Sequence, residues 1–182
     1  MSCRNCSGIQ IKRNIILNGH GEGINLYENC TNAVIEDNYL AGPRAMGIYI
    51  DTSNGILVRN NLLITTTTTP ANDGYAGGGA LAVNNEAYHY TGGALQPTTV
   101  AYNVTFINNL VSGFNLGIGL YGQYDGTDYR GIKYYNNVFV DCEYAIADYL
   151  NNAKVRPGGI EIKNNLFVES KEQILRLKIF LI

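Results

Sequence analysis

A nine-residue motif occurs six times in this chain, and any fold must accommodate that repetition. Each copy carries apolar residues spaced by two, then an Asn, then further apolar residues. The aligned residues are Asn14, Asn38, Asn61, Asn109, Asn137 and Asn165, with spacings of 24, 23, 48, 28 and 28 residues. A period in this range is typical of a solenoid, in which each unit buries its apolar face only against its neighbours. The spacing of 48 fits either two coils or one coil with large insertions.

Each copy of the motif is predicted to be a strand, because its residues alternate with a period of two and are rich in β-branched and aromatic types. A second strand that opens on a small residue follows each of the first five copies. These second strands begin at Gly23, Gly47, Ala80, Gly117 and Ala145. An inward Asn at a tight turn can bond its own backbone and the Asn of the next coil, so we expect the six Asn residues to form a ladder.

The Gly-Ile-x-Ile and Ile-x-x-Asn-Asn elements resemble those of the right-handed parallel β-helix repeat proteins, the pectin-lyase-like superfamily, over about residues 8–169. The resemblance implies an all-β fold, a single-stranded right-handed parallel β-helix of about six coils with an internal Asn ladder. We expect residues 1–170 to form this solenoid, as a segment of a longer one, and residues 171–182 to form a last strand or a cap. These motifs are specific for fold and nearly silent on function.

Composition argues against two classes of function, nucleic-acid binding and membrane spanning. The formal charge is −2 and charged residues make up only 15%, which argues against a nucleic-acid partner. No run approaches the ~20 apolar residues of a membrane span. The first residues do not look like a signal peptide, and we expect the chain to be part of a longer secreted protein, extracellular or on a cell surface.

Cys6 and Cys30 lie one repeat apart, 24 residues, and should stack in adjacent coils about 5 Å apart. That separation allows a disulfide, and it equally allows a ladder of small buried thiols.

Both residues after each motif Asn are apolar, whereas a strand with one wet face should alternate. One of these two columns is therefore expected to lie outside the core. Turn residues could bury it locally, or another subunit or the remainder of a longer chain could cover it.

The resemblance also implies that a functional cleft runs along the sheet of small-residue strands. The outward positions of those strands are rich in Tyr and Asn, and a long insertion beside them adds another Tyr. Tyr rings can stack on sugar faces and amides can bond hydroxyls, so we predict a polysaccharide partner. The predicted substrate-binding residues are Asn25, Tyr27, Tyr49, Asn84, Tyr88, Tyr121 and Tyr149. The plainer interpretation is that Tyr is simply a good exposed strand residue.

Five residues are candidates for catalysis. His20 and Arg44 align on the turn entering this sheet, Asp51 ends one of its strands, and Glu86 and His89 lie in an insertion that leaves it. Arg can neutralise a sugar carboxylate and His can take a proton, which fits an acidic sugar. The alternative is that these are polar residues on wet turns and loops with ordinary salt bridging.

These features lead to two hypotheses. The first is a polysaccharide-active or polysaccharide-binding β-helix, in its sharpest form a lyase on a uronate-containing polymer. Inverting hydrolysis is less favoured, because Asp51 has no second strand carboxyl at the required ~6.5–9.5 Å. No metal ligand set is predicted; calcium would need an acidic cluster on the sheet, and the sequence shows none. The second hypothesis is a non-catalytic segment of a cell-surface, adhesin-like or phage-tail-like protein.

Overall fold

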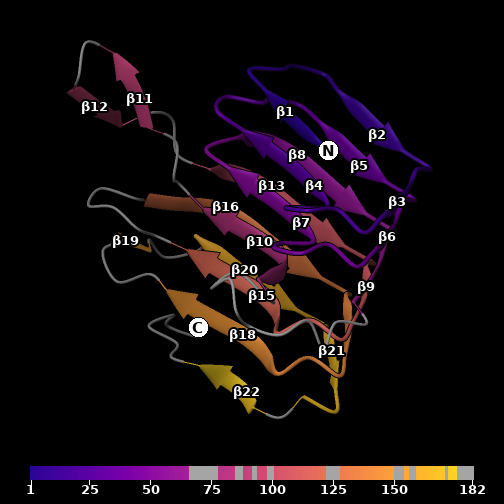
Figure 1. Cartoon of the computed structure of the whole chain (residues 1–182). Helices are drawn as coiled ribbons and strands as arrows, with labels where there is room; N and C mark the ends of the chain where they lie inside the picture. The colour runs from indigo at the N-terminus through magenta and orange to yellow at the C-terminus, as the bar shows by residue number, and fades with distance from the viewer. Residues whose placement is uncertain are drawn as a thin grey trace.

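The computed structural model describes residues 1–65, 78–84, 88–91, 94–97, 101–121, 128–149, 154–155, 159–170 and 172–175. These residues form strands, bridges and turns, and none of them is helical. The chain winds through three parallel sheets in turn, so strands far apart in sequence lie side by side (Figure 1). We call them sheets A, B and C, and we name corners AB, BC and CA after the sheets they join. The predicted parallel β-helix is confirmed.

Sheet A contains the predicted small-residue strands, and all of its pairings are parallel. Its order along the solenoid is β1 (Ser2–Arg4), β4 (Ile24–Tyr27), β7 (Ile48–Asp51), β10 (Gly79–Asn84), β15 (Leu116–Tyr121), β18 (Tyr144–Tyr149) and β22 (Glu172–Leu175).

Sheet B contains the strands that lead up to the motif Asn residues. It runs through β2 (Gln10–Lys12), β5 (Val34–Glu36), β8 (Asn54–Arg59), β13 (Tyr102–Ile107), β16 (Asp128–Tyr135) and β20 (Ile160–Lys163). A short strand, β19 (Lys154–Val155), pairs with the beginning of β16.

Sheet C contains the short strands that follow the Asn residues. Its members are β3 (Ile15–Leu17), β6 (Tyr39–Ala41), β9 (Leu62–Ile64), β14 (Leu110–Ser112), β17 (Val138–Val140) and β21 (Leu166–Val168).

The spacing of 48 residues between the third and fourth motifs corresponds to one coil with insertions. β9 pairs directly with β14, and β8 pairs directly with β13. An antiparallel hairpin of β11 (Tyr88–Thr91) and β12 (Ala94–Pro97) lies within this coil, between β10 and β13, and projects from the solenoid (Figure 1). Insertion length therefore does not break the register of the coil stack.

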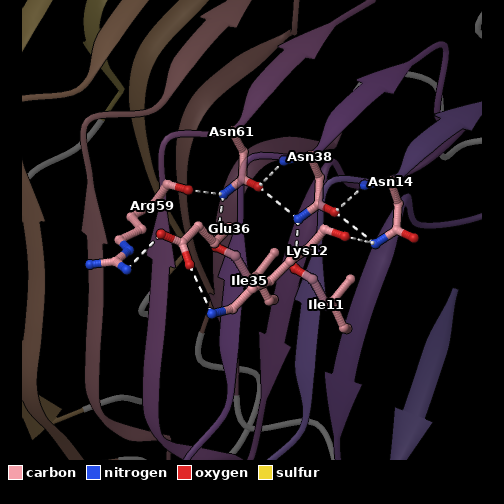
Figure 2. A network of polar contacts seen from close by, with 8 residues as sticks. All are labelled: Ile11, Lys12, Asn14, Ile35, Glu36, Asn38, Arg59 and Asn61. Atoms are coloured by element: carbon pink, nitrogen blue, oxygen red, sulfur yellow. Dashed lines mark hydrogen bonds and ion pairs between the residues drawn. The ribbon is translucent and has the colours of Figure 1, made fainter.

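The Asn residues form the predicted ladder along corner BC. From Asn38 onward, each Oδ1 accepts hydrogen bonds from the backbone N–H and the Nδ2 of the Asn one coil earlier, at 2.9–3.0 Å. Each Nδ2 also donates to a backbone carbonyl, as Asn38 does to Ile11 (Figure 2). The Asn amides thus supply hydrogen-bond partners for the backbone groups of this largely buried corner and for one another.

The residue before each ladder Asn has a left-handed backbone. φ lies between 52° and 56° at Arg13, Asp37, Asn60, Asn108, Asn136 and Asn164. Asn and Asp tolerate this region better than most residues, which explains the Asn-Asn pairs of the later copies.

Candidate functional site

The outward face of sheet A carries the predicted substrate-binding positions. The Ile and Leu side chains of β4 and β7 are fully buried in the core. The alternating residues therefore project outward, and parallel register aligns them from coil to coil. Asn25 pairs with Tyr49, Tyr49 with Ala82, and Asp51 with Asn84.

Three of these outward residues are nevertheless almost completely buried, which alternation alone does not predict. Tyr49, Asp51 and Asn84 are 4%, 5% and 1% exposed. The Asn84 Nδ2 donates a hydrogen bond to the Tyr49 hydroxyl at 2.8 Å. We call these three residues the sheet A polar cluster.

Small residues beside the cluster give large side chains room to lie against the sheet. Tyr49 pairs with Ala82, and Ala82 pairs with Gly119. A Cβ at Gly119 would come within 2.7 Å of Cε2 of Tyr121, so the Tyr121 ring lies over that glycine. The result is a close-packed aromatic and amide surface over adjacent coils.

Asn25 supplies an unused acceptor beside the cluster. Its Oδ1 is buried and has no hydrogen-bond partner among the described residues. A buried acceptor without a donor is costly, and a ligand hydroxyl or a water would satisfy it. Tyr27, on the same strand, is half-buried.

Corner AB, which follows Asp51, is held by buried hydroxyls. The Thr52 Oγ1 accepts from the Glu28 backbone N–H at 3.1 Å, and the Ser53 Oγ accepts from the Cys30 N–H at 3.2 Å. The Ser53 hydroxyl also lies 2.9 Å from the Asp51 carbonyl, to which it donates. These bonds fix the backbone at the end of β7, where the Asp51 carboxylate emerges.

His20 and Arg44 stack as expected but lie at the other end of sheet A. Both are exposed at corner CA, where the Arg44 N–H donates to the Gly19 carbonyl at 3.0 Å. The strand β7 separates Arg44 from Asp51, and its four residues span about 13 Å. The structure therefore does not bring His20 and Arg44 together with Asp51.

The remaining predicted residues are only partly placed. Tyr88 and His89 lie in β11 and Tyr149 lies at the end of β18; the structure describes the backbone of these residues. In the register of sheet A, Tyr149 pairs with Tyr121. Glu86 lies outside the described residues.

Sequence reasoning missed the hydrogen bond between Asn84 and Tyr49, which are 35 residues apart. The available signal was the alignment of small-residue strands, which places Asn84 two residues beyond the partner of Tyr49. It also missed the Thr52 and Ser53 bonds, for which a Thr-Ser pair at the end of a strand was the only local sign.

The cysteines are structural. Cys6 and Cys30 are free thiols in adjacent coils, where the Cys6 carbonyl accepts from the Thr31 N–H. Burial, reinforced by hydrogen bonding to Cys30, raises the pKa of Cys6 to about 12. Burial likewise raises the pKa of Cys142 to about 11. Thiols held so far from ionisation are poor nucleophiles.

No group of three or more His, Cys, Asp or Glu residues in the described part of the chain is arranged to hold a metal ion. Over the same residues, no helix is long and apolar enough to cross a membrane.

Comparisons with known proteins address the fold. Residues 1–176 match a family model described as the right-handed β-helix region. The crystal structure of the Agl-KA catalytic domain is similar at 14% identity with a TM-score of 0.42. That similarity covers 92% of this chain but only 42% of the other. No curated protein matches the sequence significantly.

Proposed function

The chain belongs to the right-handed β-helix family, and on that premise we propose that it is a polysaccharide-binding β-helix whose glycan site is the outward face of sheet A. One observation carries the proposal: amide and phenol groups follow one another across adjacent coils of this face, and the buried Asn25 Oδ1 has no donor among the residues that the structure describes. Sugar rings offer apolar C–H faces to Tyr and hydroxyls to amides.

Binding is tested by retention of the protein on pectate, alginate and glycosaminoglycan, followed by calorimetric titration with oligosaccharides of the retained polymer. Tyr27→Ala should weaken binding about 2- to 10-fold, the value of one aromatic contact. Tyr102→Ala is the matched control, because Tyr102 is an exposed Tyr, 37% exposed, on sheet B. Retention on none of the polymers, or equal loss in both variants, would contradict the proposal.

The finer candidate is a lyase on a uronate-containing polymer, supported by the enclosed carboxylate of Asp51. It lies across from Asn84, whose amide is held by Tyr49. In β-elimination a base removes the proton on the carbon beside the uronate carboxylate, and the electron pair of that C–H bond forms a C=C bond. The glycosidic C–O bond breaks, the leaving oxygen takes up a proton, and the sugar retains an unsaturated end. Arg44 and Asp51 lie at opposite ends of β7, about 13 Å or more apart. A polymer chain lying along β7 would therefore contact the Arg44 guanidinium with one sugar unit and the Asp51 carboxylate with another.

Ultraviolet absorbance of unsaturated ends distinguishes the lyase from a binding module. Absorbance that grows with wild type and is lost in Asp51→Asn and His89→Ala would support catalysis, and a parallel incubation with a chelator tests for calcium. Glycan retention without turnover would instead indicate a non-catalytic segment of a cell-surface protein. Both versions of the proposal place the protein outside the cell or on its surface, where such polymers occur.

A further inference from the structure

The outward face of sheet C is apolar from one end of the solenoid to the other. In each strand the middle residue points into the core, so the first and third residues point outward. The outward residues are Ile15, Leu17, Tyr39, Ala41, Leu62, Ile64, Leu110, Ser112, Val138, Val140, Leu166 and Val168. Ile15 is 73% exposed, Leu17 57%, Leu166 55% and Leu110 43%. None of these twelve positions is charged.

Sheet B shows that this is not a general property of the repeat. Its outward positions include Lys12, Glu36, Arg59, Lys133, Glu161 and Lys163. Glu36 bridges Lys12 and Arg59 across three coils, with contacts of 3.0 and 2.6 Å (Figure 2). Sheets B and C run through the same six coils with the same parallel pairing, yet of the two only sheet B carries charged residues at its outward positions. A contiguous exposed apolar face marks an interaction site.

We propose that sheet C is the interface of a homodimer, in which two copies pack this face together with their solenoid axes antiparallel. The two-fold axis passes between β9 and β14, at the middle of the six-stranded sheet. β3 of one copy then faces β21 of the other, β6 faces β17, and β9 faces β14. This isologous contact buries the same residues on both subunits. It is independent of the polysaccharide proposal, and the partner covers sheet A on neither copy.

Charges at corner CA favour the antiparallel arrangement. The corner carries His20, Glu22 and Arg44 after the first two sheet C strands, and Asp141, Glu143 and Glu169 after the last two; His20 is formally neutral at pH 7. Arg44 and Asp141 are the exposed opposite charges of this rim. Antiparallel stacking brings Arg44 toward Asp141 of the partner. Parallel stacking would instead bring Asp141 and Glu169 opposite corner BC, at the level of Asn136 and Asn164. Opposite charges across a rim set orientation more than affinity.

The size of the face indicates a weak, reversible dimer. Six strands about 4.8 Å apart and three residues of about 3.3 Å give roughly 29 by 10 Å on each copy. Two such faces bury about 580 Å² in total before their corners are added, which lies below the roughly 1,200 Å² of specific, stable interfaces and in the range of weak, transient ones. We therefore expect association at micromolar to millimolar protein concentration.

Sedimentation velocity over that concentration range tests the dimer. The weight-average mass should rise from 19.9 kDa toward twice that value. Leu62 lies next to the two-fold axis. Leu62→Lys should raise the protein concentration at which half of the chains are dimeric by at least 10-fold. Leu57→Lys is the matched control, because Leu57 is also a half-buried, outward Leu of the same coil, on sheet B. Leu110→Ser, at a more exposed position, serves as a milder second variant should Leu62→Lys unfold.

A wild-type protein that stays monomeric to about 1 mM would overturn the proposal, as would equal effects of Leu62→Lys and Leu57→Lys. The orientation has its own test. Asp141→Arg and Arg44→Asp should each weaken association, and the double variant should restore it. Failure of the double variant to restore association would overturn the antiparallel arrangement.

Discussion

A single Asn in the ladder satisfies more polar groups than any neighbouring residue of its corner. Asn109 accepts from the backbone and side chain of Asn61 and donates to the Val58 carbonyl and to Asn137, and it is 1% exposed. Asn109→Ala should lower the free energy of unfolding by about 3 kcal/mol, because buried donors and an acceptor lose their partners. Urea denaturation measures this. Asn108→Gly is the control: φ is 56° there, so it should be neutral or slightly stabilising. Equal losses at both positions would contradict the ladder's role.

The Glu36 carboxylate on sheet B predicts a pH dependence. Hydrogen bonding to Lys12, together with Arg59, lowers the pKa of Glu36 below its usual value. A carboxyl whose pKa is lower in the folded state stabilises the fold above its unfolded pKa of about 4.3, and that contribution is lost as pH falls through the folded pKa. The urea midpoints of wild type and Glu36→Gln should therefore differ most near pH 7 and converge below about pH 4. A difference that does not change with pH would rule out this linkage.

At the scale of the strand, the small first residues of sheet A are explained by their contacts. A Cβ at Gly47 would lie 2.5 Å from the Ala80 carbonyl oxygen and 2.6 Å from Cδ2 of Leu63. Gly47→Ala should thus cost about 1–3 kcal/mol through overpacking against backbone that cannot move freely. Gly21→Ala is matched to it, since nothing lies within 4 Å of a Cβ at that position, and should change the thermal midpoint little. A comparable loss at Gly21 would show that the clash is not responsible, because lower freedom of the unfolded chain would by itself stabilise the fold slightly.

Elements could be predicted from the sequence wherever a coil repeats. The Asn ladder, the small-residue strands and the apolar outer column of sheet C all follow from aligning the copies, because stacking makes each position contact its own equivalent. The polar cluster did not follow. Burial of Tyr49 and Asp51 on an outward face depends on what lies beside them, such as Ala82 and Gly119, and on a hydrogen bond between Asn84 and Tyr49 whose residues do not occupy equivalent positions of neighbouring coils. Alternation specifies which way a side chain points and does not specify what covers it.

At the scale of the whole molecule, a solenoid's stability is a sum over coils and over the contacts between neighbours, so it should vary along the axis. Ile35, Val58 and Phe106 in the second to fourth coils are fully buried, whereas Ile9 and Ile16 of the first coil are only half-buried. Amide hydrogen exchange should therefore be slowest in β5, β8 and β13 and faster in β2 and β3, as local opening costs less where only one side is stacked. Ile35→Ala should speed exchange in the coils on both sides of it, while Ile11→Ala should act mainly on the first coil. Equal protection along the axis in wild type, or a uniform effect of both variants, would mean that the coils unfold as one unit.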